Sequence, residues 1–188
     1  MPKGFQIEDQ EGLHYLTFQV IEWVDIFSRQ GIKDIVVNSL KYCQQNKGLV
    51  LYAWVIMSNH IHLLGQSKAG NISGFIRDFK KHTSKAIIEY IQSDRESRRD
   101  WMLNIFRTAA SKTKRNKDFQ VWTHENHCIQ IYTDSFVRDK LEYIHINPVR
   151  SDIVEKPEYY IYSGARNYAG EKGMLDVEII TTKWHTYS

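Results

Sequence analysis

Hydrophobic and polar positions follow two repeating patterns along this chain, and the patterns predict its strands and helices. Stretches rich in aromatic and β-branched residues are typical of strands, whereas apolar residues three and four apart are typical of amphipathic helices. The predicted strands cover residues 13–23, 49–57 and 60–66, with a fourth strand in two pieces at 119–122 and 128–132. The predicted helices cover residues 33–45, 71–90, 101–106 and 133–147.

The order of these elements predicts the fold class. Strand, helix, strand, strand, helix, strand is the βαββαβ pattern of a ferredoxin-like α+β sandwich with an antiparallel sheet, here followed by an extra helix. We expect Gly31 in a loop, a hairpin turn at Ser58 and Asn59, and an end to the last helix at Pro148. Residues 1–150 then form one domain, and the aromatic segment 151–188 is an extension that packs on it.

The composition narrows the class of protein but does not indicate a function. Of the 188 residues, 42% are hydrophobic and 25% are charged, and a net charge of +3 does not by itself indicate a partner. The longest apolar run, residues 49–57, covers about half a membrane span. The two cysteines, Cys43 and Cys128, have neither zinc-finger nor disulfide-framework spacing. We therefore expect a soluble, cytoplasmic protein without membrane contact.

Two histidines separated by one apolar residue are the first candidate for chemistry. Side chains in a strand alternate between faces, so His60 and His62 point the same way and could bind one metal ion. Such a pair on a strand is also common in proteins that bind no metal. The pattern alone therefore leaves both interpretations open.

The last predicted helix carries a second group of candidates. Tyr143 and Asn147 lie four residues apart on one helix face, at the edge of the apolar side that must pack on the sheet, whereas His145 points elsewhere. With His60 and His62, the amide of Asn147 would give two nitrogens and one oxygen, a set that suits Mg²⁺ or Mn²⁺ better than a closed zinc site. Tyr143 could attack a phosphodiester, although a tyrosine at such an edge often only packs.

Two phrases in this order resemble one protein family. MSNHIHLL at residues 57–64 and YIHINPVR at residues 143–150 resemble the single-tyrosine HUH transposases, especially REP-associated tyrosine transposases and related insertion-sequence enzymes. The resemblance runs from about Tyr15 to Tyr168 and includes the phrase KPEYYIYSGARNY. The segment VWTHENHCIQI before the last helix departs from the phrase common in the family.

The resemblance implies a nuclease domain, residues 1–150, that binds single-stranded DNA, often through a hairpin. It implies metal-assisted strand cleavage that leaves a 5′-phosphotyrosine and a free 3′-hydroxyl and can be reversed to rejoin strands. Matched residue by residue, His60 and His62 become metal ligands, Tyr143 the nucleophile and Asn147 the third ligand. Relatives include both monomers and homodimers, so either state is possible.

Clusters of basic residues are candidates for DNA contact, because cations neutralise phosphates, although such runs are often only solvated surface. They are Arg77, Lys80, Lys81 and Lys85 on the second long helix, and Lys112, Lys114 and Arg115 after the short one. Besides an active strand transferase, two alternatives remain. One is a decayed protein that only binds hairpin DNA, and the other is a hydrolase in which water attacks and Tyr143 positions the phosphate.

Overall fold

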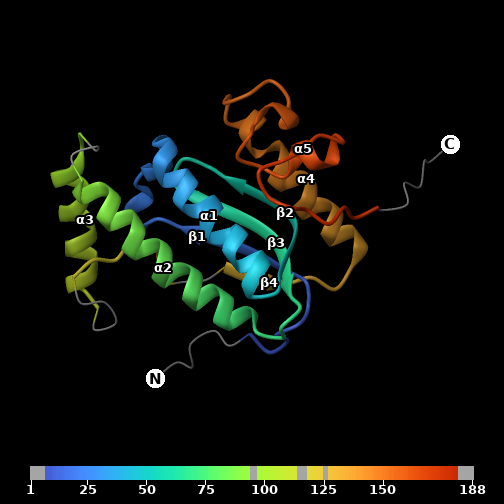
Figure 1. Cartoon of the computed structure of the whole chain (residues 1–188), viewed down its shortest axis with the longest axis horizontal. Coiled ribbons are helices and arrows are strands. Elements are labelled where there is room, and N and C mark those ends of the chain that lie inside the picture. Colours follow the sequence, from blue (N-terminus) through green and yellow to red (C-terminus); the bar gives the residue numbers. More distant parts are fainter. Residues whose placement is uncertain (1–6, 94–96, 114–117, 125–126, 182–188) are drawn as a thin grey trace.

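A four-stranded antiparallel sheet forms the centre of the structure (Figure 1). The structure is a computed structural model, and it describes residues 7–93, 97–113, 118–124 and 127–181. The strands β1 (His14–Gln19), β2 (Leu49–Ile56), β3 (His60–Ser67) and β4 (His127–Gln130) lie in the order β2-β3-β1-β4. This order and the antiparallel pairing confirm the predicted ferredoxin-like α+β fold.

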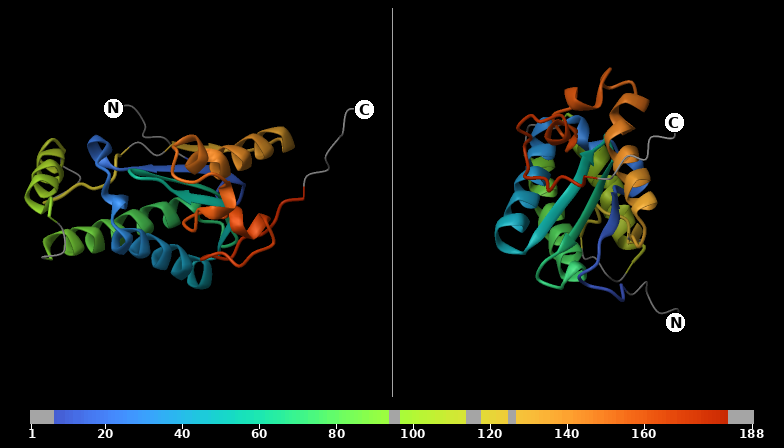
Figure 2. Two further views of the ribbon diagram at one scale, coloured as in Figure 1. Left: turned by 90° about the horizontal axis from the view of Figure 1, so that it is seen from above. Right: turned by 90° about the vertical axis from the view of Figure 1, so that its right-hand side faces the viewer.

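Helices cover both faces of the sheet. The helices α1 (Gln30–Asn46) and α2 (Ile72–Gln92) pack side by side on one face, and α4 (Asp134–Arg150) lies across the other (Figure 2). The helix α3 (Arg99–Ser111) extends beyond the sheet and contacts α2. The short elements are η1 (Ile21–Trp23), η2 (Ile26–Ser28), η3 (Pro157–Tyr159) and α5 (Ala165–Tyr168).

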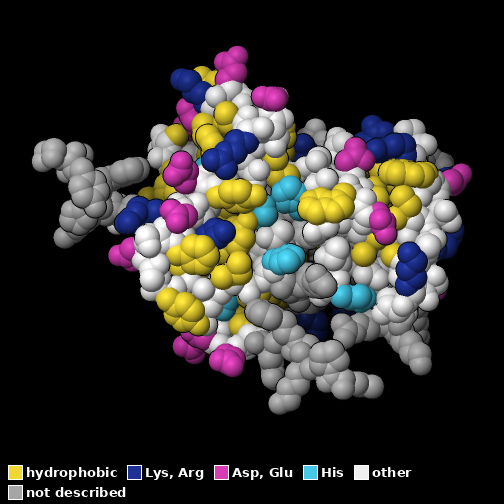
Figure 3. All heavy atoms as spheres, turned by 180° about the vertical axis from the view of Figure 1, so that it is seen from behind, with side chains coloured by type: hydrophobic (Ala, Val, Ile, Leu, Met, Phe, Trp, Pro, Cys, Tyr) yellow, Lys and Arg dark blue, Asp and Glu magenta, His cyan; other side chains and the backbone are white. Residues whose placement is uncertain are grey.

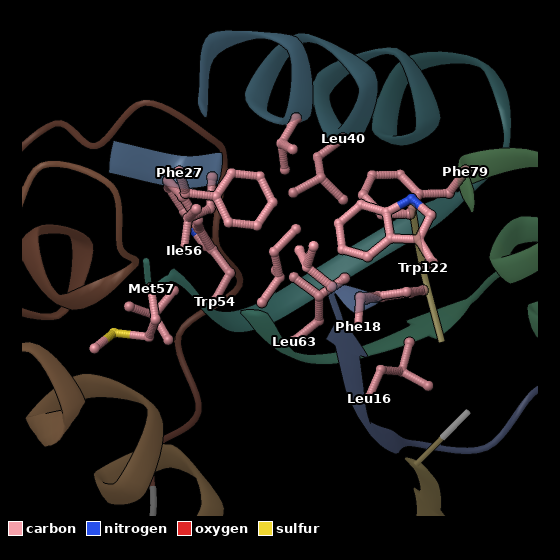
Figure 4. Packing of buried hydrophobic residues seen from close by; sticks show 14 of the residues in the cluster. Leu16, Phe18, Phe27, Leu40, Trp54, Ile56, Met57, Leu63, Phe79 and Trp122 are labelled. Carbon is pink, nitrogen blue, oxygen red and sulfur yellow. The ribbon is translucent and has the colours of Figure 1, made fainter. Parts of the chain in front are cut away.

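Alternation along the strands separates the hydrophobic core from the face that carries the histidines. Leu16 and Phe18 of β1 point toward α1 and α2, together with Trp54 of β2 and Leu63 of β3 (Figure 4). The rings of Phe18 and Phe79 lie 4.9 Å apart between their centroids. The intervening residues of β1 and β3 therefore face the side of the sheet on which α4 lies.

The described part of the C-terminal extension lies along the edge strand β2. The backbone nitrogen of Ile56 donates to the carbonyl of Tyr162 at 3.0 Å, and that of Gly164 donates to the carbonyl of Trp54 at 2.9 Å. The Tyr160 hydroxyl donates to the carbonyl of Ile56 at 2.7 Å. These bonds cover backbone groups that an edge strand would otherwise leave open to pairing.

The first strand is shorter than predicted. It ends at Gln19, after which Val20 forms an isolated bridge with Trp122 and η1 begins. In the part wrongly assigned to the strand, Glu22 and Trp23 have positive φ angles and Trp23 is 58% exposed. Aromatic and β-branched residues favoured a strand here, but these left-handed residues turn the backbone out of it, which explains the wrong boundary.

Three smaller predictions also need correction. The predicted strand at 119–122 is limited to the bridge at Trp122, and β4 begins at His127. Gly31 lies inside α1 rather than in a loop. Pro148 does not end α4, which continues to Arg150. A proline in the last turn removes only one helical hydrogen bond, and Asp152, at φ 54°, ends the helix in a left-handed conformation.

The length and apolar character of the helices and the burial of the two cysteines bear on membrane crossing and on thiol reactivity. Among the helices that the structure describes, none combines the length and the apolar character needed to cross a membrane. Cys43 and Cys128 are both buried as free thiols. Burial raises the pKa of the Cys43 thiol to about 11 and that of Cys128 to about 12, so neither is a reactive thiolate.

Candidate active site

The structure brings His60, His62 and Tyr143 together between β3 and α4. The two imidazole rings lie 4.7 Å apart between centroids on the same face of β3, as the alternation of a strand requires. The ring of Tyr143 lies 5.4 Å from that of His62. Residues separated by about eighty positions in the sequence therefore form one cluster on the face that α4 covers.

Two hydroxyl groups of β1 hold the ring of His62. The hydroxyl of Tyr15 lies 2.8 Å and that of Thr17 lies 2.9 Å from Nδ1 of His62. Thr17 is directly opposite His62 in the β1–β3 register, and the Tyr15 ring stacks on the imidazole at 5.3 Å. Fixing one ring nitrogen in this way directs the other toward a ligand.

The second nitrogen of each histidine is left for another partner. The Nε2 atom of His62 is buried and has no hydrogen-bond partner among the described residues. Nδ1 of His60 donates to the Oδ1 atom of Asn59 at 2.7 Å, so its Nε2 carries the lone pair, and no described residue forms a hydrogen bond with that nitrogen. Metal-binding histidines are commonly held in this way, with a hydrogen bond fixing the ring nitrogen that does not bind the metal.

Burial sets the charge state of these groups. Burial lowers the pKa of His62 to about 3, with smaller contributions from His60 and Lys140, and it also lowers the pKa of His60. Both imidazoles are therefore neutral near pH 7, as metal binding requires. Burial raises the pKa of Tyr15 to about 12, so its hydroxyl keeps its proton.

Asn147 fits the role of a third, oxygen-bearing ligand. It follows Tyr143 by one helical turn, and its side-chain nitrogen is buried without a hydrogen-bond partner in the described part of the chain. A half-turn of the amide would put its oxygen at the same place. Within the described ranges, no three His, Cys, Asp or Glu side chains gather to hold a metal ion, so an amide would have to complete the set.

Lys140 places a positive charge in the same cluster. Its Nζ atom lies 4.6 Å from the ring centroid of Tyr15 and 5.8 Å from that of Tyr143. No carboxylate of the described residues forms an ion pair with it, so its charge is available to an anion. The sequence interpretation overlooked Lys140, although its position three residues before Tyr143 could have identified it.

Trp23 lies at the open side of the cluster in an unusual conformation. Its ring lies 6.1 Å from that of His60 at an angle of 81°, and 58% of the side chain is exposed. Both Glu22 and Trp23 have left-handed backbones, with φ of 50° and 55°. For residues other than glycine this conformation costs roughly 1–2 kcal/mol each.

The sheet register places a further histidine on this face. His127 of β4 is paired with Thr17 of β1, so its exposed side chain points to the same side as that of His62. In Figure 3, histidine side chains lie near the centre of this face with hydrophobic side chains around them. The sequence alone had left the role of His127 open between a second metal site, with His124, and a solvated loop residue.

The basic residues predicted to bind DNA lie elsewhere. Arg77, Lys80, Lys81 and Lys85 line a groove of about 960 Å³ between α2 and residues 118–124, on the other side of the sheet from α4. Lys80 donates to the carbonyl of Thr123 at 2.9 Å, and burial lowers its pKa to about 8. Lys112 ends α3, whereas Lys114 and Arg115 lie outside the described residues.

Comparisons with known proteins relate this chain to transposases. The family described as "Transposase IS200 like" matches residues 14–106, a range that holds both histidines and ends before Tyr143. The fold is similar to that of a REP-associated tyrosine transposase solved bound to a REP hairpin, with 16% identity, a TM-score of 0.59, and coverage of 97% of this chain and 94% of that one. A candidate transposase from Deinococcus radiodurans R1 has 16% identity over 77% of this chain and 95% of its own, with a TM-score of 0.41. No curated protein gives a significant match.

Proposed function

This chain belongs to the family of IS200-like transposases, and we propose that it is a metal-dependent endonuclease and strand transferase acting on single-stranded DNA beside a hairpin. The observation that carries the proposal is the contact between Tyr143 and His62, whose Nε2 atom is buried without a partner in the described residues. This contact places the phenol ring of Tyr143 beside an imidazole whose Nε2 atom could bind a metal ion.

Tyr143 is the proposed nucleophile. The residue is 37% exposed, so a DNA strand can approach it, and its ring packs edge-to-face against that of His62. The phenolic oxygen attacks phosphorus and loses its proton, while the bond from phosphorus to the 3′ oxygen breaks and that oxygen takes up a proton. The products are a 5′-phosphotyrosine and a free 3′-hydroxyl, and attack by a 3′-hydroxyl reverses the step.

His60, His62 and Asn147 are the proposed ligands of a divalent ion, Mg²⁺ or Mn²⁺. The orphaned nitrogen of His62, the orphaned amide of Asn147 and the neutral state of both imidazoles fit such an ion. When bound, the ion would polarise the phosphodiester and stabilise its developing negative charge. The residues Tyr15, Thr17 and Asn59 act by keeping the two rings in place.

Lys140 supplies a charge that the sequence interpretation did not include. Its ammonium group lies within 5.8 Å of the ring centroids of both Tyr15 and Tyr143, where it can bind a non-bridging oxygen of the phosphate. Stabilising the negative charge on the phosphate in this way promotes attack by Tyr143.

Hairpin DNA is the proposed partner. The structurally similar transposase is bound to a REP hairpin, and the groove beside α2 carries four of the basic residues named above. That groove lies on the opposite side of the sheet from Tyr143, so we propose that it contacts DNA distant from the cleaved phosphate. Its contribution should therefore be to binding rather than to cleavage.

We also propose the domain boundary suggested by the sequence, with the nuclease domain at residues 1–150 and the extension at 151–188. The bonds from Tyr160, Tyr162 and Gly164 to β2 support an extension that packs on the same domain. Residues 182–188 lie outside the described part of the chain.

Cleavage of hairpin oligonucleotides tests the proposed function. The oligonucleotides are taken from the DNA that flanks the gene, labelled at one end, and incubated with Mg²⁺ or Mn²⁺ before denaturing electrophoresis. We expect cleavage at one position that is lost in His60→Ala and on addition of a chelator, with hairpin binding retained. Binding without cleavage in every metal would support the decayed binding protein instead.

A further inference from the structure

Trp23 is the most exposed of the aromatic side chains that contact a proposed metal ligand among the described residues. Its ring lies 6.1 Å from that of His60. Two other tryptophans, Trp54 and Trp122, are buried in the core, with 0% and 4% of their side chains exposed. The exposed Trp101 lies on α3 and packs near the guanidinium of Arg98. Core packing therefore does not explain the position of Trp23.

The amide of Asn59 links Trp23 to His60. Its oxygen accepts from Nδ1 of His60 at 2.7 Å, and its nitrogen donates to the backbone carbonyl of Trp23 at 3.3 Å. The same side chain thus positions the imidazole and the segment that carries the indole. The placement of Trp23 is tied to the geometry of the site rather than to the surrounding surface.

The backbone around Trp23 is held in a conformation that these residues rarely adopt. Glu22 and Trp23 have positive φ angles, and bonds on both sides fix the turn: the nitrogen of Ile21 donates to the carbonyl of Val121 at 2.8 Å, and that of Val24 donates to the carbonyl of Ile21 at 3.2 Å. Successive left-handed residues other than glycine are typical of segments that present a side chain for function. Here the result is an indole projecting next to His60.

An exposed indole next to a phosphate-binding site suits an unpaired nucleobase. Proteins that bind single-stranded DNA stack bases on aromatic rings, and every base offers a flat face for this contact. We propose that Trp23 stacks on an unpaired base adjacent to the cleaved phosphate and thereby fixes which phosphate reaches Tyr143. This inference rests on the proposed function, because it assumes a single strand in the site.

An abasic scan tests the stacking. Hairpin oligonucleotides from the DNA flanking the gene carry a single abasic nucleotide at each position of the single-stranded flank in turn. Binding is measured by fluorescence anisotropy in Ca²⁺ for the wild type, Trp23→Leu, Trp23→Phe and Trp101→Leu. The Trp101 variant is the matched control, because it also removes an exposed tryptophan, and thermal unfolding checks that each variant is folded.

We expect Trp23→Leu to weaken binding of the intact oligonucleotide by roughly tenfold, Trp23→Phe by much less and Trp101→Leu hardly at all. At one abasic position the wild type should lose affinity to the same extent, and Trp23→Leu should cause no further loss there. An equal effect of Trp23→Leu at every abasic position, or no effect on the intact oligonucleotide, would overturn the inference.

The result is separable from the proposed function. The scan measures binding, so it does not need cleavage, and a wild type that stacks one base but forms no covalent adduct would refute the strand transferase while supporting the stacking. Conversely, an active wild type whose cleavage position is unchanged in Trp23→Leu would refute the role of Trp23 in selecting the phosphate and leave the proposed function intact.

Discussion

The hydroxyl of Tyr15 lies 2.8 Å from Nδ1 of His62, and the hydroxyl of Thr17, two residues further along the same strand, lies 2.9 Å from that nitrogen. One imidazole nitrogen thus has two hydroxyl partners, while the other is buried without a partner in the described residues. This asymmetry is more specific than the presence of two adjacent histidines, because it fixes which nitrogen is available to a metal ion.

Removal of these hydroxyl groups should weaken metal binding. Tyr15→Phe and Thr17→Val each leave one partner for Nδ1 of His62, so each should lower Mn²⁺ affinity only a few-fold, whereas the double variant should lower it by about 10- to 100-fold. Calorimetric titration with Mn²⁺ measures the effect. Tyr132→Phe, which removes an exposed hydroxyl from a residue near β4, is the control. An unchanged Mn²⁺ affinity in the double variant would contradict the proposal that His62, oriented by these two hydroxyl groups, binds the metal ion.

Lys140 should matter for cleavage more than for DNA binding. In Lys140→Gln the charge beside Tyr143 is lost, so we expect the cleavage rate at saturating DNA to fall by roughly 10- to 100-fold while the affinity for DNA changes little. Lys140→Arg should recover part of the rate because it restores the charge. Arg138→Gln removes a cation from the exposed face of the same helix and should leave the cleavage rate near wild type.

Acid should destabilise the metal-free protein partly through His145. This side chain packs against Tyr168 at 4.9 Å, and burial lowers its pKa to about 4 from an ordinary value of 6.5. Below pH 6.5 His145 becomes protonated in the unfolded chain but stays neutral in the native state. The native state therefore loses stability relative to the unfolded chain as the pH falls from 6.5 toward 4. His62 acts in the same direction.

Substitution of His145 isolates its share of this effect. Between pH 7 and pH 5, His145→Phe should lose about 2 kcal/mol less of its unfolding free energy than the wild type does. Urea unfolding at the two pH values gives the difference, which does not depend on the absolute stability of the variant. Parallel losses in the two proteins would contradict the buried neutral state of His145.

The extension should contribute strongly to stability. Tyr162 has 4% of its side chain exposed, and its hydroxyl donates to Asp34 of α1 at 3.0 Å. Tyr162→Ala should therefore lower the free energy of unfolding by about 3–5 kcal/mol. Tyr159→Ala, at a position that is 57% exposed, should change it by less than about 0.5 kcal/mol. Urea unfolding compares the two, and equal effects would argue that residues 151–188 do not pack as an integral part of the domain.

The sequence was sufficient to predict the arrangement of the fold but not its details. The order of elements and the strand alternation correctly indicated an antiparallel sheet with His60 and His62 on one face. The prediction failed at Trp23, where aromatic residues suggested a strand but the backbone turns. Periodicity records which residues are buried, and a left-handed turn leaves no mark in it when no glycine is present.

The partners of the site residues depend on contacts between elements, and single-sequence patterns do not contain them. Thr17 lies beside His62 because of the β1–β3 register, which no local pattern specifies. The basic residues of α2 were recognised as a cluster, but the packing of α2 places them on the opposite side of the sheet from α4. Only Lys140, three residues from Tyr143 on one helix, could have been found by spacing.

The nature of the bond between protein and DNA tests the central claim most directly. After incubation of the wild type with a hairpin oligonucleotide and Mn²⁺, the covalent product is digested with protease and the modified peptide is sequenced by mass spectrometry. We predict a nucleotide 5′-phosphate attached to the oxygen of Tyr143, and no adduct or cleavage in Tyr143→Phe. Cleavage that persists in Tyr143→Phe without any adduct would contradict the account, because water rather than the tyrosine would then be the nucleophile.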